Sequence, residues 1–205
     1  GIKILPVIAS VAMAQKVEKQ GADAVIAEGT EAGGHIGEIT TMCLTPQIVD
    51  AVNIPVVCAG GIADVRGAVA AFALGADGIQ VGTKFICSTE CIAHDNYKQA
   101  VIKAKDRDAV VTGRSTGAPV RALKNKLTKE YQRLEAENAS AQEIEQLGVG
   151  GLRRAFEEGD TQMGSLMAGQ SAAMVKEILP CAEIIKGYFE DIDSVLNNIK
   201  NNMER

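Results

Sequence analysis

A glycine-rich stretch at residues 27–37 (AEGTEAGGHIG) carries the side chains best suited to chemistry. Four glycines in eleven residues remove most side-chain bulk, so the backbone can turn sharply and approach a ligand closely. The bulky polar groups that remain are Glu28, Glu31 and His35. Because an imidazole titrates near neutral pH, His35 can donate or accept a proton there. The pattern predicts a catalytic or substrate-orienting role for His35.

The other ionisable groups of this kind have plainer interpretations. Glu28 stands at the end of an apolar segment, where a hydrogen-bonded structural carboxylate is favoured over a general base. Glu28 and Glu31 remain candidates to orient His35 or to coordinate a cation. The second histidine, His94, lies beside Asp95 in a polar connection and is interpreted as a solvated surface residue.

Two further glycine turns follow apolar segments, at Gly60-Gly61 and at Gly82-Thr83. Glycines can simply end strands, and either turn alone favours that interpretation. The presence of both turns at matching positions favours a phosphate site. Such a site is built from backbone N–H groups, a helix N-terminus and the hydroxyl of Thr83. Such sites lie at the carboxyl ends of the last strands of (β/α)₈ barrels.

The elements that must position these residues alternate between strand and helix. Apolar, β-branched runs predict four strands, and the segments between them have helical spacing with polar caps and closing glycines. The pattern Pro-Val, helix, Gly-Ala-Asp, strand occurs twice, which is a βαβα unit written twice. The predicted strands are residues 4–9, 23–28, 54–59 and 77–81, and the predicted helices between them are 11–20, 47–52 (capped by Thr45-Pro46) and 65–74.

This alternation predicts an α/β fold with half of a (β/α)₈ barrel in residues 1–92. A doubly wound sheet is the alternative, but the first strand is not followed by its G-x-G-x-x-G signature. Residues 93–205 show no further alternation and are interpreted as a helical appendage, or lid, with an irregular stretch at 110–120 and a long helix at 121–139. Because the chain opens directly in a strand, we expect the first barrel half to precede it.

Composition is consistent with an α/β enzyme. Of 205 residues, 46% are hydrophobic but only 3% are aromatic, which suits parallel strands covered on both faces. A net charge of −5 argues against a nucleic-acid partner, and no apolar run approaches the length of a membrane span. The five cysteines include no C-x-x-C pair, so we expect reduced thiols in a cytoplasmic protein and no metal site.

Several segments together resemble the FMN-dependent enoyl-[acyl-carrier-protein] reductase II family, within the nitronate monooxygenase-like flavin barrels. The resemblance covers essentially the whole chain and corresponds to the C-terminal two-thirds of that family. Nitronate monooxygenases share the segments at 27–37, 54–64 and 75–85, whereas the segments at 120–125 and 164–170 favour the reductase. The segments are AEGTEAGGHIG (27–37), IPVVCAGGIAD (54–64), GADGIQVGTKF (75–85), AHDNYK (93–98), VRALKN (120–125) and GSLMAGQ (164–170).

The resemblance implies a set of site residues and a reaction. His35 is implied to stand near the isoalloxazine and the thioester, as proton donor or orienting group. NADH or NADPH reduces FMN, and hydride then passes to the β-carbon of a trans-2-enoyl thioester linked to acyl carrier protein, in fatty acid synthesis. Members respond to monovalent cations, and a homodimer is implied. The implied FMN contacts are Glu28, Gly29, Gly33, Gly34, Ala59, Gly60, Gly61, Gln80, Gly82 and Thr83, and the implied substrate or lid contacts are Ser165, Met167, Gly169 and Gln170.

The resemblance leaves alternatives open. A nitronate monooxygenase, which oxidises alkyl nitronates with FMN, carries the same three glycine loops. An inactive half-barrel that needs a complementary half is a further alternative, because four strands alone leave two sheet edges unpaired. On that basis we expect this polypeptide by itself neither to bind FMN tightly nor to turn over.

Overall fold

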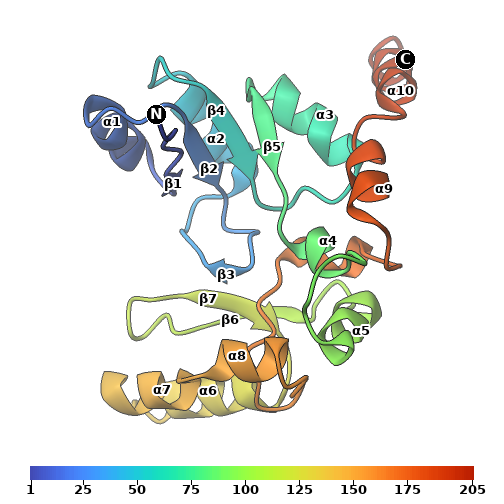
Figure 1. Cartoon of the computed structure of the whole chain (residues 1–205). Helices are drawn as coiled ribbons and strands as arrows, with labels where there is room; N and C mark the ends of the chain where they lie inside the picture. Colours follow the sequence, from blue (N-terminus) through green and yellow to red (C-terminus); the bar gives the residue numbers. More distant parts are fainter. The chain divides into compact units, whose positions relative to one another are not determined.

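The computed structural model describes residues 1–205, which divide into two compact units (Figure 1). The chain passes between the units inside the glycine-rich stretch. The C-terminal segment, grouped with the lid by sequence, packs with the strand-helix unit instead. The first unit comprises Gly1–Thr30, Gly37–Val81 and Pro180–Arg205, and the second comprises Glu31–Ile36 and Gly82–Leu179.

The first unit is built on a parallel four-stranded sheet, as the alternation predicts. Its spatial order is β1 (Val7–Ile8), β2 (Val25–Glu28), β4 (Val56–Ala59) and β5 (Gly78–Gln80). The α/β class with parallel strands is therefore confirmed, while the eight-stranded barrel around it stays a prediction. The helices between these strands are α1 (Val11–Lys19), α2 (Thr41–Val49) and α3 (Val65–Ala73).

Two of the three helix starts confirm the predicted caps. Ser10 Oγ accepts a hydrogen bond from the backbone N–H of Met13 at 3.3 Å, and Asp64 Oδ1 accepts one from Arg66 at 2.9 Å. These side chains satisfy N–H groups that the helix itself leaves unpaired.

The predicted start of α2 at Thr45-Pro46 is wrong. The helix begins at Thr41, and Pro46 lies inside it. Proline removes one backbone donor, but the turns on both sides close, with Leu44 N–H donating to Thr40 O at 2.8 Å and Asp50 N–H to Pro46 O at 3.0 Å. The helix is stabilised by burial of Leu44 and Ile48 rather than by a cap at Thr45.

An aliphatic core holds the first unit together. Ile8, Val25, Leu44, Ile48 and Val56 are among its members, and each is 2% exposed or less. The C-terminal helices α9 (Cys181–Lys186) and α10 (Ile192–Met203) belong to this unit, and α10 packs against α3 (Figure 1).

The second unit contains a sheet that the sequence interpretation missed. Its antiparallel strands lie in the order β3 (Gly34–His35), β7 (Val120–Leu123) and β6 (Ala109–Thr112). The predicted irregular stretch at 110–120 is thus a β-hairpin, and the predicted helix at 121–139 begins only at Lys126. The β-branched residues at 110–112 favour strand, and left-handed glycines at 113 and 117, with φ of 78° and 77°, form the turn.

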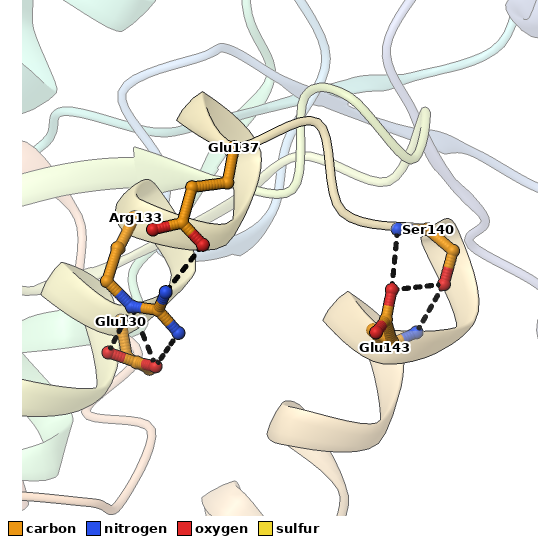
Figure 2. A network of polar contacts seen from close by, with 5 residues as sticks. All are labelled: Glu130, Arg133, Glu137, Ser140 and Glu143. Carbon is orange, nitrogen blue, oxygen red and sulfur yellow. Dashed lines mark hydrogen bonds and ion pairs between the residues drawn. The ribbon is translucent and has the colours of Figure 1, made fainter.

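Short helices complete the second unit: α4 (Thr83–Ile86), α5 (Asp95–Lys103), α6 (Lys126–Ala136), α7 (Ala141–Gly148), α8 (Gly151–Phe156) and the 3₁₀ helix η1 (Gln170–Met174). Capping boxes at Asn125 and Ser140 begin α6 and α7. Figure 2 shows the second of these, in which Glu143 Oε2 accepts from the backbone N–H of Ser140 at 2.9 Å. Arg133 on α6 pairs with Glu130 and Glu137 beside it.

A separate apolar core holds the second unit, with Tyr97, Val101, Leu123 and Leu166 among its buried members. None of the helices in the structure is both long and apolar enough to cross a membrane.

Candidate functional site

Three residues implied in FMN binding form one row at the carboxyl ends of the parallel strands in the first unit. Glu28 of β2 stands opposite Ala59 of β4, and Ala59 stands opposite Gln80 of β5. Beside them, the backbone N–H of Gly29 donates to the carbonyl of Ala59 at 2.9 Å. The parallel register therefore brings these side chains to the sheet edge where α/β folds bind ligands.

The turn that follows β4 accepts only glycine. Gly60 and Gly61 both have left-handed backbones, with φ of 95° and 74°. A Cβ added at Gly60 would lie 2.9 Å from Gly29 O and 3.0 Å from Thr41 Oγ1. The Thr41 hydroxyl lies 3.0 Å from the carbonyl oxygen of Gly60, to which it donates. The turn is thus a close-packed, side-chain-free surface.

The helix that follows this turn, α3, has a carboxylate side chain at its N-terminus. Asp64 caps α3 and also pairs with Arg66, whose Nε and Nη2 donate to the carboxylate. That pairing holds the pKa of Asp64 below its ordinary value, with the Arg66 hydrogen bond as the largest cause. The N-terminus of α3 is therefore already paired with a carboxylate of the chain itself.

Glu28 has the electrostatics of a partly buried carboxyl group. Burial raises its pKa above the ordinary value of 4.5. A carboxylate that loses hydration at a sheet edge holds its proton more tightly. This environment agrees with a structural carboxyl and also leaves Glu28 able to donate a hydrogen bond when protonated.

The other predicted glycine turn, Gly82-Thr83, belongs to the second unit, at the start of α4. Thr83 is 9% exposed, and its Oγ1 accepts a hydrogen bond from the backbone N–H of Gly169 at 2.9 Å. This bond joins the start of α4 to the GSLMAGQ segment, 86 residues later in the chain. The hydroxyl implied in phosphate binding thus fixes a predicted substrate segment.

The His35 loop packs directly against the same segment. A Cβ added at Gly33 would lie 2.5 Å from the carbonyl carbon of Ala168, and one added at Gly169 would lie 2.6 Å from Glu31 O. The backbone N–H of Gln170 donates to Glu31 O at 2.9 Å. The two segments meet backbone to backbone, which explains why glycine occupies both sides.

Met167 lies at the centre of this contact. Its carbonyl accepts a hydrogen bond from the Tyr97 hydroxyl at 2.6 Å, and its backbone forms a bridge with Ala122 of β7. Its Sδ would lie 3.6 Å from a Cβ added at Gly34. The methionine side chain is therefore beside the residue that precedes His35.

His35 is held by backbone pairing and leaves its side chain exposed. It pairs with Val120, and Gly34 pairs with Arg121, in the antiparallel ladder of β3 and β7. The His35 side chain borders a cavity of about 380 Å³ that lies within the second unit, together with Ser165 and Met167. An accessible imidazole at the wall of a mainly apolar cavity can transfer a proton to a ligand bound there.

The prediction of a solvated His94 is wrong. His94 is half-buried, and its Nδ1 accepts a hydrogen bond from the backbone N–H of Asn96 at 3.1 Å, which caps α5. Gly159 packs against the imidazole ring, since a Cβ there would overlap it. Its role is structural. All five cysteines are free, and no cluster of three or more His, Cys, Asp or Glu side chains is arranged to hold a metal ion.

Several residues that shape the site carry no local sequence signal. Arg121 is 6% exposed, and burial lowers its pKa while the nearby Glu31 raises it. Tyr97 and Thr41 hold backbone turns through hydroxyl bonds to carbonyls on distant segments. Tyr131 borders the cavity from α6. A buried arginine and hydroxyls inside helical patterns are visible as unusual residues only once burial is known.

Three comparisons place these observations among known proteins. The family model described as nitronate monooxygenase matches residues 1–191. A Staphylococcus saprophyticus protein named "Probable nitronate monooxygenase" is 38% identical over 96% of this chain and 58% of its own length. Since the match covers 58% of that relative, the chain spans less than two thirds of it.

Solved structures are similar over nearly the whole chain. FabK from Thermotoga maritima is 47% identical with a TM-score of 0.94, covering 98% of this chain and 64% of that one. Nitroalkane oxidase from Streptomyces ansochromogenes is 32% identical with a TM-score of 0.81, covering 97% and 60%. The parallel strand-helix fold and its glycine turns are consistent with these similarities. The chain belongs to the nitronate monooxygenase family, a family of oxidoreductases.

Proposed function

We propose that this chain is part of an FMN-dependent enoyl-[acyl-carrier-protein] reductase. The observation that carries the proposal is the position of His35 and Met167 on the wall of one mainly apolar cavity. A substrate with an extended aliphatic chain fits such a cavity better than a small polar one does. The 47% identity with FabK, higher than the 32% with nitroalkane oxidase, supports the same choice.

The first unit offers a surface that fits the phosphate of FMN. The left-handed Gly60-Gly61 turn has no Cβ, and Thr41 fixes its backbone from behind. Such glycine turns let backbone N–H groups approach phosphate oxygens closely. We assign Gly60 and Gly61 to phosphate binding, and the strand-end row of Glu28, Ala59 and Gln80 to the surface beside the cofactor.

The chain's own residues then position and protonate the substrate. FMN, when bound, would supply hydride exchange between NADH or NADPH and the β-carbon of an enoyl thioester. His35 would donate a proton towards the α-carbon, or hydrogen-bond the thioester carbonyl. Gly33, Thr83 and Gly169 would hold the His35 loop against Met167 through the contacts described above.

The test separates the two half-reactions. With FMN added, NADH should bleach the flavin absorbance without oxygen, and crotonyl thioester should restore it. His35→Ala should slow the reoxidation by about 10²–10⁴-fold, the range for loss of general acid catalysis, while bleaching by NADH is kept. Reoxidation by crotonyl thioester at the wild-type rate in His35→Ala would contradict the assigned role.

A nitronate monooxygenase is the second candidate, because the matching family model and the 38% identical relative carry that description. It predicts oxygen uptake with alkyl nitronates and no response to NADH. Oxygen uptake with propyl-2-nitronate, together with unbleached flavin in NADH, would replace the reductase proposal with this one.

A further inference from the structure

We propose that the cavity beside His35 binds the aliphatic tail of the substrate, and that Tyr131 and Gly148 form the end that limits tail length. The proposal rests on the proposed function, because it names the part of an acyl substrate that this site would hold. It concerns the second unit alone, since all lining residues belong to that unit.

The cavity lies between the antiparallel sheet and the helices α6, α7 and α8. The lining includes residues of the sheet and residues of the helices. The His35 end is formed by His35, Val120, Ala122 and Met167, which are joined by strand pairing and by the bridge between Ala122 and Met167. The Tyr131 end, defined by Tyr131, Ile144 and Gly148, is built by α6 and α7. A tail that starts at the reacting group beside His35 would therefore extend towards the helices.

Two threonine hydroxyls of the cavity lining are already hydrogen-bonded within the protein. The Thr128 hydroxyl donates to Asn125 O at 3.0 Å and accepts from the Asn125 N–H at 2.9 Å, both within the capping box of α6. The Thr116 hydroxyl donates to Gly113 O at 3.0 Å. With the Thr116 and Thr128 hydroxyls engaged by the protein, their methyl groups suit an aliphatic ligand, because a hydrocarbon beside them leaves neither hydroxyl unpaired.

The charged groups on the lining argue against a tail that ends in a carboxylate. Arg153 is the one arginine on the lining, which has no lysine; it is exposed, and its Nε donates to Glu157 at 2.8 Å. Glu145, also exposed, contributes a negative charge. An anionic tail end would meet this carboxylate and an arginine that is already paired, whereas a methyl end meets Ile144 and the Tyr131 ring.

Tyr131 makes a tight contact with Gly148, and both line the cavity. A Cβ added at Gly148 would overlap the Tyr131 hydroxyl, so the glycine allows the ring to lie against the end of α7. Burial raises the pKa of Tyr131, which keeps the phenol neutral. A large neutral ring at this position would limit the length of a tail that reaches it, and its removal would allow a longer one.

The test measures binding, without flavin or turnover. The chain is titrated with saturated N-acetylcysteamine thioesters, from butanoyl through octanoyl and dodecanoyl to hexadecanoyl, by isothermal calorimetry. Affinity should rise about four-fold per added methylene, the value expected for burial of one CH₂, until the tail meets Tyr131 and the gain stops. In Tyr131→Ala, the gain should continue to longer tails.

Two variants control the interpretation. Tyr131→Phe keeps the ring and should stop the gain at the wild-type tail length. Val120→Phe narrows the His35 end and should weaken binding of every tail by about ten-fold or more. Circular dichroism and a thermal melt establish that each variant is folded. An affinity that does not depend on tail length, or a stop that does not move in folded Tyr131→Ala, would overturn the proposal.

The outcomes separate this inference from the proposed function. Length-dependent binding without reoxidation of flavin by crotonyl thioester would leave the tail site standing and remove the reductase. Reoxidation by crotonyl thioester combined with binding that is independent of tail length would do the reverse.

Discussion

Individual residues in this chain matter most where a side chain is excluded or loses its hydration. The Gly60-Gly61 turn combines a left-handed backbone with a neighbouring carbonyl at the position of a missing Cβ. Gly82, which has the same predicted role, has φ of −106° and no atom within 4 Å of an added Cβ. Two glycines with one predicted role therefore differ in what they require structurally.

This difference predicts unequal effects of one substitution. Gly60→Ala should lower the free energy of unfolding by about 1–3 kcal/mol, because alanine is strained at positive φ and its methyl group meets Gly29 O. Gly82→Ala, the matched control, should change it by less than about 1 kcal/mol. Urea denaturation measures both. Equal losses would show that the turn at Gly60 tolerates a side chain.

Glu28 gives the first unit a dependence on pH. Burial raises the pKa of Glu28 in the folded chain above the ordinary value of 4.5. Between the pKa of the unfolded chain and that of the folded chain, the folded chain therefore binds more protons. The contribution of Glu28 to the free energy of unfolding therefore falls as pH rises through that window. Glu28→Gln removes this fall, so the variant should gain stability relative to wild type as pH rises above about 4.5.

Urea denaturation at several pH values measures the effect. Glu177→Gln, which removes an exposed carboxyl group of the second unit, reports the general consequence of losing one negative charge. If Glu28→Gln and Glu177→Gln change stability with the same pH dependence, the burial of Glu28 has no part in it.

At the scale of elements, the second unit brings four segments to one place. The His35 loop, the start of α4, the end of β7 and the GSLMAGQ segment are connected mainly by backbone groups. Backbone contacts of this kind fix positions more rigidly than contacts between long side chains, because little rotamer entropy is lost. We infer that the imidazole of His35 is oriented by this assembly as a whole.

Thr83 is the residue that tests this assembly. Thr83→Val keeps the shape but leaves the buried N–H of Gly169 without its acceptor, which should cost about 1–3 kcal/mol. Thr83→Ser keeps the acceptor and should retain most of the stability. Hydrogen exchange at the Gly169 amide should accelerate in Thr83→Val only. Equally slow exchange in both variants would show that the hydroxyl does not hold the segment.

At the scale of the whole molecule, the chain has two separate apolar cores, one in each compact unit. Neither unit is continuous in sequence, because the His35 loop belongs to the second and the C-terminal helices belong to the first. Gly60 and Gly61, which we assign to the FMN phosphate, belong to the first unit, and the residues assigned to the substrate belong to the second unit.

A leucine-to-alanine substitution in one core should therefore destabilise mainly the unit that contains it. Leu44→Ala in the first unit and Leu123→Ala in the second should each cost about 2–5 kcal/mol, because both side chains are 4% exposed or less. Hydrogen exchange with mass spectrometry should show faster exchange of β2 and β4 after Leu44→Ala, and of β6 and β7 after Leu123→Ala. Faster exchange of all four strands in either variant would show a single cooperative core.

Much of the first unit follows from the sequence, because the signals there are local. The strands at 25–28 and 56–59, the caps at Ser10 and Asp64, and the glycine turn after β4 are patterns of neighbouring residues. The hairpin at 109–123 does not follow from local pattern, because its glycine-rich turn looks like irregular chain. The start of α2 does not follow either, because proline favours the first helical position, whereas Pro46 lies inside this helix.

The sequence by itself determined the α/β class, the parallel strands and His35 as the distinctive ionisable group of a glycine-rich loop. The tertiary structure alone decided what surrounds His35: the Thr83–Gly169 bond across 86 residues, the Tyr97 bond to Met167, and the cavity that His35 and Tyr131 both line. The physical reason is range. Caps, turns and periodicity act between neighbours along the chain, whereas burial and cavity shape depend on segments that meet only after folding.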